Sequence, residues 1–332
     1  MRLFVVAGSL PWISFLWSLG RDGGSGDNAD VNLPVTDSLW ARAAERIKLD
    51  RGWLLEPLGR LGQQRQDRRT WLARCASGHV VVKAVSNPFS AARAQWAATA
   101  LPALAGRGYP VPELAWYGPL DDHWSLTVWP RLPGRPLDRL GPAVLDRLLA
   151  LTELQAGPLP AGDGWDISWW ISAILFDGWE GLWETTWQVA PQEAARLRAF
   201  LEPAWGHRLP AGDVVHHDFG LHNVLAQDDT ITGVIDWDDA GTGSRATDLA
   251  SLLFEWHRML LGGKQPAPGG DEKIASRIAA IAGDDGLRCV VVYVAIDWIG
   301  LTAQRGDTAG TETYRQVTSA VLDTLTGSSA RT

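Results

Sequence analysis

The sequence predicts an α+β fold in which a small lobe built on an antiparallel sheet precedes a larger, mostly helical lobe. Short apolar runs separated by turn residues follow one another between residues 53 and 132, as in a strand meander. Beyond residue 140 the pattern is mostly helical. With 332 residues, 46% of them hydrophobic and 20% charged, the chain can bury the core of one large domain or of two coupled lobes.

The first 35 residues are expected to form a flexible extension. The run "LFVVAGSLPWISFLWSL" (3–19) resembles the core of a signal peptide, but it contains Pro11 and no A-x-A-like cleavage site follows. It is also shorter than the roughly 20 apolar residues of a membrane span. "GRDGGSGDNAD" (20–30) has the composition of a flexible linker. A signal peptide remains the alternative.

The first lobe is predicted at residues 36–131 and the second at 132–332. A helix is expected over 36–50, capped by Thr36, Asp37 or Ser38. Strands are expected in "WLLEPLG", "TWLARCA" and "HVVVKAV", and two more in "YPVPELAWYG" and "HWSLTVWPRL". Between these two groups a helix runs from Asn87-Pro88 to about Gly106. In the second lobe, "NVLAQ" and "TITGVIDW" form a hairpin.

Charge and cysteine content restrict the partners and the compartment. The net charge of -8 and the pI near 5.4 argue against a nucleic-acid partner, since such proteins usually carry a basic surface. No membrane partner is expected. Cys75 and Cys289 lie far apart in the chain, so a disulfide framework is improbable and a cytoplasmic setting fits better.

Histidines and aspartates gather in "DVVHHDFGLHNVLAQDDTITGVIDWDDA" (213–240). His216, His217, Asp218 and His222 could ligate zinc or iron, but adjacent strand residues point to opposite faces and no further His/Cys cluster completes a shell. A solvated charged turn is a second alternative. The spacing favours a third, because H-x-D, four residues, an asparagine and then a hairpin ending in "IDW" is the arrangement of kinase catalytic loops.

Kinase chemistry gives three of these residues a role. Mg²⁺ prefers oxygen ligands, which Asn223 and Asp236 can present from the two ends of the hairpin. Asp218, on the loop before Asn223, can then accept the proton of an attacking hydroxyl.

"VVHHDFGLHNVL" followed by "GVIDWDDAGTGSRATDLA" resembles the signature of the aminoglycoside phosphotransferase family. The resemblance covers residues 50 to 325 roughly, with residues 214–250 the discriminating part. It implies a bilobal protein-kinase-like fold with ATP or GTP and Mg²⁺ as cofactors. Asp218 is then the catalytic base, and Asn223 and Asp236 are the Mg²⁺ ligands. The resemblance also makes Asp248 a structural brace of the catalytic loop and His216 a packing residue, and it assigns no role to His217 or His222.

A kinase-like first lobe must supply a phosphate-binding lysine. Lys83, one of four lysines in the chain, lies in the apolar run "VVVKAV" and fits that role. Residues 84–112 contain no acid, so Gln95 is expected in place of the helix glutamate that usually holds this lysine. Backbone groups of Val128, Trp129 and Arg131 are expected to contact the nucleotide base.

The acceptor is expected to be a cationic small molecule. No Lys or Arg occurs between Arg147 and Arg196, where acids and tryptophans alternate. Carboxylates and indole faces attract cations, and each such interaction contributes on the order of 1 kcal/mol of binding free energy. The predicted acceptor-binding residues are Asp163, Asp166, Asp177, Glu180, Glu184 and Trp179.

These features lead us to expect a cytoplasmic kinase, monomeric or homodimeric, that phosphorylates a hydroxyl of an antibiotic such as an aminoglycoside or a basic peptide. A macrolide acceptor suits the tryptophans better than the acids. A metabolite kinase acting on choline, homoserine or a sugar is a further alternative. A non-catalytic nucleotide-binding module is the third class, against which the intact Lys83, Asp218, Asn223 and Asp236 count.

Overall fold

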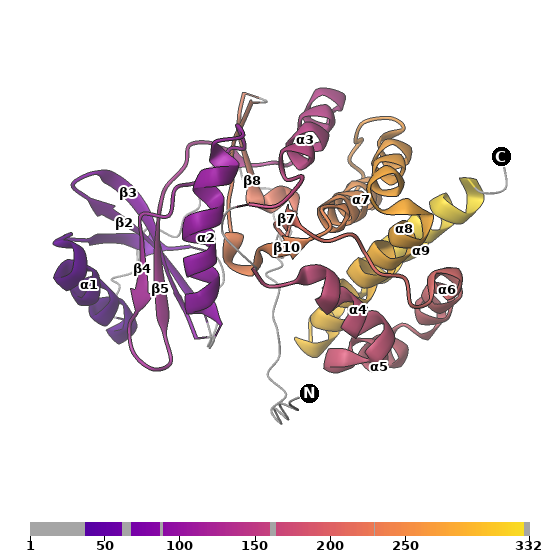
Figure 1. Cartoon of the computed structure of the whole chain (residues 1–332), viewed down its shortest axis with the longest axis horizontal. Helices are drawn as coiled ribbons and strands as arrows, with labels where there is room; N and C mark the ends of the chain where they lie inside the picture. Colours follow the sequence, from indigo (N-terminus) through magenta and orange to yellow (C-terminus); the bar gives the residue numbers. More distant parts are fainter. Residues whose placement is uncertain (1–36, 62–67, 87–88, 160–163, 229, 329–332) are drawn as a thin grey trace.

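The computed structural model describes residues 37–61, 68–86, 89–159, 164–228 and 230–328. It shows a small N-lobe built on an antiparallel sheet and a larger helical C-lobe, side by side along the longest axis (Figure 1). The predicted fold class is therefore confirmed. The extension expected at residues 1–35 lies outside the described residues.

The N-lobe sheet has the strand order β1-β2-β3-β5-β4. Its strands are β1 (Glu56–Arg60), β2 (Arg68–Cys75), β3 (Gly78–Val85), β4 (Trp116–Pro119) and β5 (Ser125–Pro130). Each overlaps a run that the sequence predicts as a strand. Since β3 pairs with both β2 and β5, Lys83 lies in the middle of the sheet, opposite Thr70 and Thr127.

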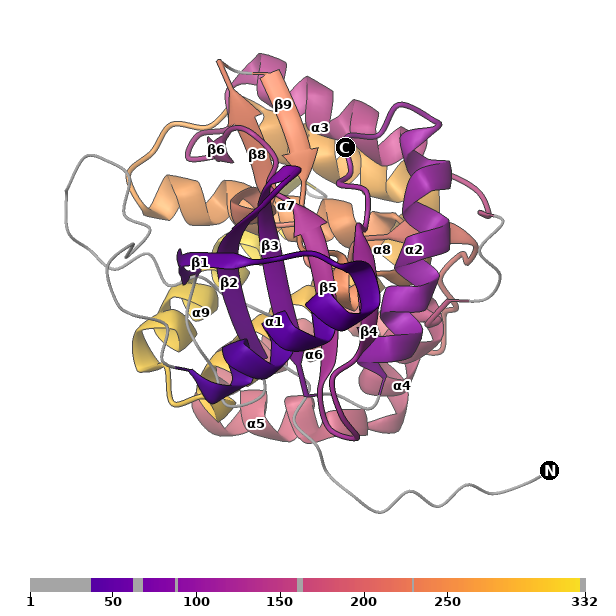
Figure 2. The ribbon, with the colours of Figure 1, turned by 90° about the vertical axis from the view of Figure 1, so that its left-hand side faces the viewer.

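The two faces of this sheet serve different purposes. Side chains alternate along β3, so Val80, Val82 and Ala84 are buried on one face. That face packs against α1 (Ser38–Arg51), which lies across it on the side away from the C-lobe (Figure 2). Asp37 caps α1 by accepting a hydrogen bond from the Leu39 amide at 2.9 Å. The opposite face, which carries Lys83, is left for the functional site.

The helix α2 (Ser90–Ala105) flanks the sheet on the side facing the C-lobe (Figure 1). Its buried residues Trp96, Leu101 and Leu104 belong to the same hydrophobic core as the C-lobe helices. The N-lobe is thus joined to the C-lobe by packing as well as by the chain itself.

The C-lobe consists of helices around two small β-sheets. Its helices are α3 (Pro142–Leu154), α4 (Ile167–Asp177), α5 (Leu182–Val189), α6 (Pro191–Leu201), α7 (Ala246–Leu261), α8 (Gly270–Gln304) and α9 (Thr308–Ser328). Short 3₁₀ turns are η1 (Trp179–Gly181), η2 (Glu202–Ala204), η3 (Leu221–Asn223) and η4 (Trp237–Asp239). Strand β7 (Asp213–Val215) pairs with β10 (Gly241–Gly243), and β8 (Val224–Gln227) lies between β6 (Arg135–Pro136) and β9 (Thr230–Val234).

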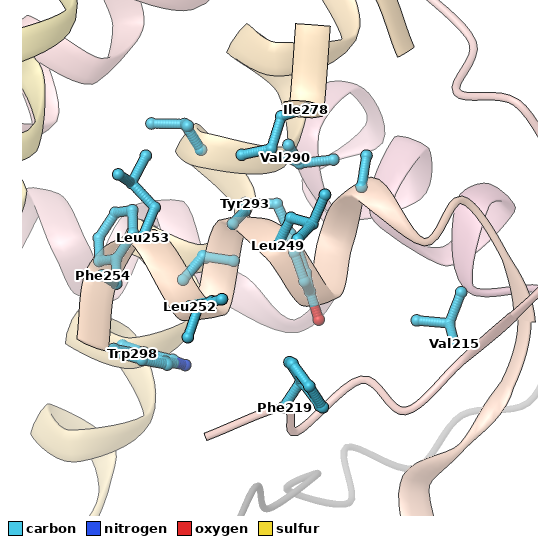
Figure 3. Close-up of a cluster of buried hydrophobic side chains, with 14 of the residues drawn as sticks. Val215, Phe219, Leu249, Leu252, Leu253, Phe254, Ile278, Val290, Tyr293 and Trp298 are labelled. Carbon is cyan, nitrogen blue, oxygen red and sulfur yellow. The ribbon is translucent and has the colours of Figure 1, made fainter. Parts of the chain in front are cut away.

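The long helix α8 is the central helix of the C-lobe. The helix has 35 residues, and its most apolar stretch has a mean hydropathy of 1.5, which would suffice to cross a membrane. However, 78% of that stretch is buried within the fold. Gly283 interrupts the helix with a φ of +75°, a left-handed conformation that glycine adopts without steric cost. Leu249 and Leu253 of α7 pack near Ile278 and Val290 of α8 (Figure 3).

We predict that Leu253→Ala lowers the free energy of unfolding by about 2–5 kcal/mol, because it opens a cavity between α7 and α8. Leu253 is 1% exposed, whereas Leu260 on the same helix is 43% exposed. Leu260→Ala is therefore the matched control and should cost less than about 1 kcal/mol. Urea unfolding measures both, and equal losses would mean that the α7–α8 packing does not carry the stability.

Candidate active site

A cavity of about 580 Å³ lies between the two lobes. The N-lobe sheet contributes Thr70, Val81 and Lys83, and the segment from Trp129 to Asp138 closes one side. The C-lobe contributes residues of the catalytic loop, which connects β7 to β8, together with parts of α7 and α9. The cavity therefore brings together segments that are more than 200 residues apart in the chain.

The catalytic loop is held by one buried carboxylate. Asp248, in the first turn of α7, accepts hydrogen bonds from the backbone amides of His216 and His217, both at 2.8 Å. Gln155 donates a third bond at 2.7 Å from its side chain. Burial raises the pKa of this carboxyl, while the three donors and His216 act in the opposite direction. Three bonds to one carboxylate fix the course of the loop, which is the geometry expected of the structural brace.

His216 is a fully buried packing residue of the same loop. Its Nε2 lies 2.8 Å from the Ile235 carbonyl oxygen, and its ring packs edge-on against Trp237. The Asp218 amide donates to Nδ1 at 3.3 Å, which leaves Nε2 to donate to the Ile235 carbonyl. This ring therefore links the catalytic loop to the segment that follows β9.

Asp218 and Asn223 form the centre of the loop. The Asn223 side-chain amide nitrogen donates to the Asp218 carbonyl at 2.9 Å and to its Oδ2 at 3.0 Å. His222 Nε2 is 3.7 Å from the same Oδ2, which is an ion-pair distance rather than a hydrogen bond. Burial by itself would raise the pKa of Asp218, but the neighbouring His222 outweighs it and the pKa lies below its usual value. The carboxyl is thus ionised at neutral pH.

Charged side chains of both lobes meet beside this loop. Lys83 Nζ binds Asp236 Oδ1 at 2.6 Å and Asp238 Oδ2 at 3.2 Å. Arg68 lies 3.7–3.9 Å from Asp236, Asp238 and Asp239. Burial acts to raise the pKa of Asp236, but Lys83 and Arg68 hold it well below its usual range. We call the set of Arg68, Lys83, Arg93, Asp236, Asp238 and Asp239 the inter-lobe ion cluster.

The ion cluster corrects the expectation that Gln95 holds Lys83. Gln95 is exposed on α2, whereas the lysine is held by Asp236 and Asp238. The helix instead contributes a cation, because Arg93 binds Asp239 Oδ1 at 2.6 Å. Kinases usually hold this lysine with a glutamate on the helix. Here the acids that bind Lys83 follow β9, and α2 carries a cation instead.

Fewer backbone groups of residues 128–131 are open to a nucleotide base than the sequence suggests. The Val128 carbonyl already accepts a hydrogen bond from the Ala115 amide at 2.9 Å, and the Val128 side chain is buried under α1, on the face away from the cavity. Trp129 and Arg131 do line the cavity, but the Arg131 amide already donates to the His79 carbonyl at 3.0 Å. Pro130 and Pro133 have no amide hydrogen. Leu132, which also lines the cavity, supplies the remaining amide hydrogen of residues 130–133.

Of the described residues predicted to bind the acceptor, none lines this cavity. Asp166 caps α4 by accepting a hydrogen bond from the Trp169 amide at 2.9 Å, and Trp179 packs edge-on against Trp169. Asp177 and Glu184 are exposed on the helical surface. Asp163 lies outside the described residues.

The surroundings of Glu180 weaken its attraction for a cation. Burial and the nearby Asp297 raise its pKa to about 8, so the carboxyl is mostly neutral at pH 7 and attracts a cation only weakly.

The predicted acidic segment contacts the catalytic loop at His217, against which Trp165 packs edge-on. His217 Nε2 lies 2.6 Å from the Tyr293 hydroxyl, and burial lowers the pKa of this histidine to about 4.

Sequence reasoning missed the residues at the far end of the cavity. Glu255 and Arg258 of α7 and Tyr314 of α9 line it together with His222. Glu255 is 1% exposed and pairs with Arg258 at 2.5 Å. A signal was present, because Glu255 follows Asp248 by seven residues and both therefore lie on one face of the helix.

The donor atoms around Asp236 fit a hard divalent cation. The amide nitrogen of Asn223 is directed to Asp218, which leaves the Asn223 side-chain oxygen as the atom for a metal. Among the described residues no group of three or more His, Cys, Asp or Glu side chains could hold a metal by themselves. A metal at Asn223 and Asp236 would thus be completed by phosphate oxygens and water, as Mg²⁺ is in nucleotide sites.

Comparison with known proteins gives matches to several kinases. Homoserine kinase of Rhizobium johnstonii is 36% identical over 103 residues, which cover 29% of this chain and 32% of that one. Viomycin phosphotransferase of Streptomyces vinaceus is 39% identical over 99 residues, covering 27% and 34%. The matched segments span about a third of the length of these relatives.

The fold has a counterpart among solved structures. A thermostable variant of aminoglycoside phosphotransferase APH(4)-Ia, in a ternary complex with ADP and hygromycin B, matches with a TM-score of 0.60 at 22% identity. The match covers 84% of this chain and 97% of that one, and at this identity it shows the fold alone. Residues 60–271, more than half of the chain, match the family model of the phosphotransferase enzymes. The chain therefore belongs to the phosphotransferase enzyme family, as the resemblance of residues 214–250 predicts.

Proposed function

We propose that this protein is a small-molecule kinase that transfers the terminal phosphate of ATP or GTP to a hydroxyl group with the help of Mg²⁺. The observation that carries the proposal is the meeting of Lys83 and Asp236, from opposite lobes, in one cavity beside Asp218 and Asn223. Phosphoryl transfer depends mainly on positioning and charge neutralisation, and these residues supply both.

Each residue of the site has a separate task in this reaction. Asp236 and the Asn223 side-chain oxygen would hold Mg²⁺, which neutralises phosphate charge when bound. Lys83, which is bonded to Asp236 in this structure, would bind phosphate oxygens. Asp218 accepts the proton of the acceptor hydroxyl, and its lowered pKa keeps the carboxylate ready for that step. The Leu132 amide and the Trp129 carbonyl are proposed to contact the base.

The acceptor is proposed to carry an amine as well as a hydroxyl. Asp138 and Glu255 line the cavity, where Glu255 is paired with Arg258, and the chain has a net charge of -8. The net charge favours a cationic ligand over a neutral one. A cationic antibiotic fits this description, and the similarity to viomycin phosphotransferase supports it. We therefore propose antibiotic inactivation as the biological role, in the cytoplasm.

Homoserine phosphorylation is the second candidate. The observation in its favour is the similarity to homoserine kinases, of which the one cited above is 36% identical over 103 residues. Homoserine also carries an ammonium and a hydroxyl group, so the same cavity wall could bind it. The two candidates differ in acceptor size, which a substrate panel can measure.

We expect phosphate transfer from ATP to viomycin or an aminoglycoside to exceed transfer to homoserine by at least about tenfold in kcat/KM, a difference of about 1.4 kcal/mol in the barrier. The measurement is the release of ADP with each acceptor, at equal enzyme concentration, with erythromycin and choline included. Faster turnover of homoserine would replace the antibiotic proposal by the metabolite kinase. Turnover of erythromycin alone would favour the macrolide alternative.

We predict that Asp218→Asn lowers kcat by about 10²–10⁴-fold, because a general base contributes that much to proton transfer. Binding of MgADP should remain within about threefold of wild type, since the base acts after both substrates are placed. Asp228→Asn, at an exposed turn five residues from the end of the same loop, is the control and should keep full activity. A kcat that stays within about tenfold of wild type in Asp218→Asn would remove this residue from the base role.

Asp236→Asn should weaken ADP binding in the presence of Mg²⁺ while leaving binding of adenosine unchanged. The substitution removes a charged oxygen ligand of the metal, and adenosine has no phosphate through which the metal could act. Calorimetric titrations with and without Mg²⁺ measure the difference. An unchanged Mg²⁺ dependence would show that the metal does not bind Asp236.

A further inference from the structure

We propose that Arg68 is a second phosphate-binding residue, which binds the phosphate chain of the nucleotide beside Lys83. This inference rests on the proposed kinase function. It assigns a role to the first residue of β2, a strand next to the one that carries Lys83.

The sheet register places Arg68 on the same face as Lys83. Thr70 lies opposite Lys83, and Arg68 lies opposite Val85. Side chains at alternate positions of a strand point to one face, so Arg68, Thr70 and Lys83 share the face that is turned to the C-lobe. Arg68 is 9% exposed and lines the cavity, as Lys83 and Thr70 do.

The charges around Arg68 favour an additional anion when a metal is present. In the inter-lobe ion cluster three cations face three carboxylates, namely Arg68, Lys83 and Arg93 against Asp236, Asp238 and Asp239. A divalent cation on Asp236 would add positive charge to this balanced set. The positive charge of Arg68 and Lys83 is then matched by phosphate oxygens, which arrive with the same metal.

The geometry of Arg68 also suits this exchange. Its N–O distances to the three carboxylates are 3.7–3.9 Å, longer than hydrogen bonds, whereas Lys83 lies 2.6 Å from Asp236. Its contacts with these three carboxylates are therefore ion pairs, and a phosphate that reaches the guanidinium would exchange with them as its anionic partner. Its planar donors match phosphate oxygens in pairs, which a lysine ammonium cannot do.

The sequence before Arg68 gives a reason for a second cation. Residues 59–69, "GRLGQQRQDRR", contain two glycines, fewer than a glycine-rich loop whose backbone amides cradle phosphates. A guanidinium at the end of this segment supplies the donors that such a backbone would otherwise provide.

The test compares Arg68→Gln with Arg74→Gln. Arg74 lies on the same strand, is exposed and pairs with Glu56, so the control removes the same charge away from the cavity. Calorimetric titration with MgADP and with adenosine should show MgADP binding weakened about 10- to 100-fold in Arg68→Gln, the effect of losing hydrogen bonds to a charged group. Adenosine binding in this variant, and both ligands in Arg74→Gln, should be unchanged.

A further variant separates charge from folding. Arg68→Lys keeps the charge that balances the ion cluster but loses the paired donors, so its MgADP affinity should lie between wild type and Arg68→Gln. If Arg68→Gln does not fold, an Arg68→Lys variant with wild-type MgADP affinity would overturn the role of the guanidinium.

Four other outcomes also decide the matter. Equal weakening of MgADP and adenosine would reduce Arg68 to a structural residue. Tighter MgADP binding in Arg68→Gln would show that the arginine only competes with the metal for the carboxylates. If wild type binds MgADP and Arg68→Gln binds it equally well, the role of Arg68 alone fails. A wild-type protein that binds no MgADP would overturn the kinase proposal itself, and the role of Arg68 with it.

Discussion

The charge balance between the lobes is the constraint on which the rest of the site depends. Three cations from the N-lobe and three carboxylates that follow β9 are largely buried, with the closest contacts at 2.6 Å. Removing one partner from such a set leaves a buried charge uncompensated, which typically costs about 3–5 kcal/mol. The cluster therefore keeps the N-lobe sheet against the C-lobe and positions Lys83.

The catalytic loop depends on a second buried carboxylate, that of Asp248. Two residues of the site, His217 and Asp236, have φ values of +71° and +66°, which side chains other than glycine rarely adopt. Such conformations cost about 1–3 kcal/mol each and persist only where the surroundings fix them. The His217 amide bonded to Asp248 and the Asp236 carboxylate bonded to Lys83 supply that fixing. The reacting groups are thereby placed before any ligand binds, which suits a reaction that depends on positioning.

The core of the site could be predicted because it is local in the chain. Asp218 and Asn223 lie in one loop, and Asp236 follows the short hairpin after it, so their spacing alone indicates that they converge. Lys83 could be predicted from alternation along a strand. The acidic segment around Trp179 stays a prediction for the acceptor, since composition shows that carboxylates and indoles are close in sequence without showing what they face. In the structure Asp166 caps a helix and Glu180 is half-buried near another acid, Asp297.

The sequence by itself determined the order of strands and helices, the two-lobe fold and the loop that carries the chemistry, because each follows from periodicity and short-range spacing. Only the tertiary structure decided what meets across the cavity. Asp238, in place of Gln95 as a partner of Lys83, comes from a segment 155 residues away, and Arg68 and Glu255 meet in the same cavity. Periodicity tells which side chains share a face of a strand or helix. It does not tell which other face they will meet, because that is decided by the packing of the whole chain.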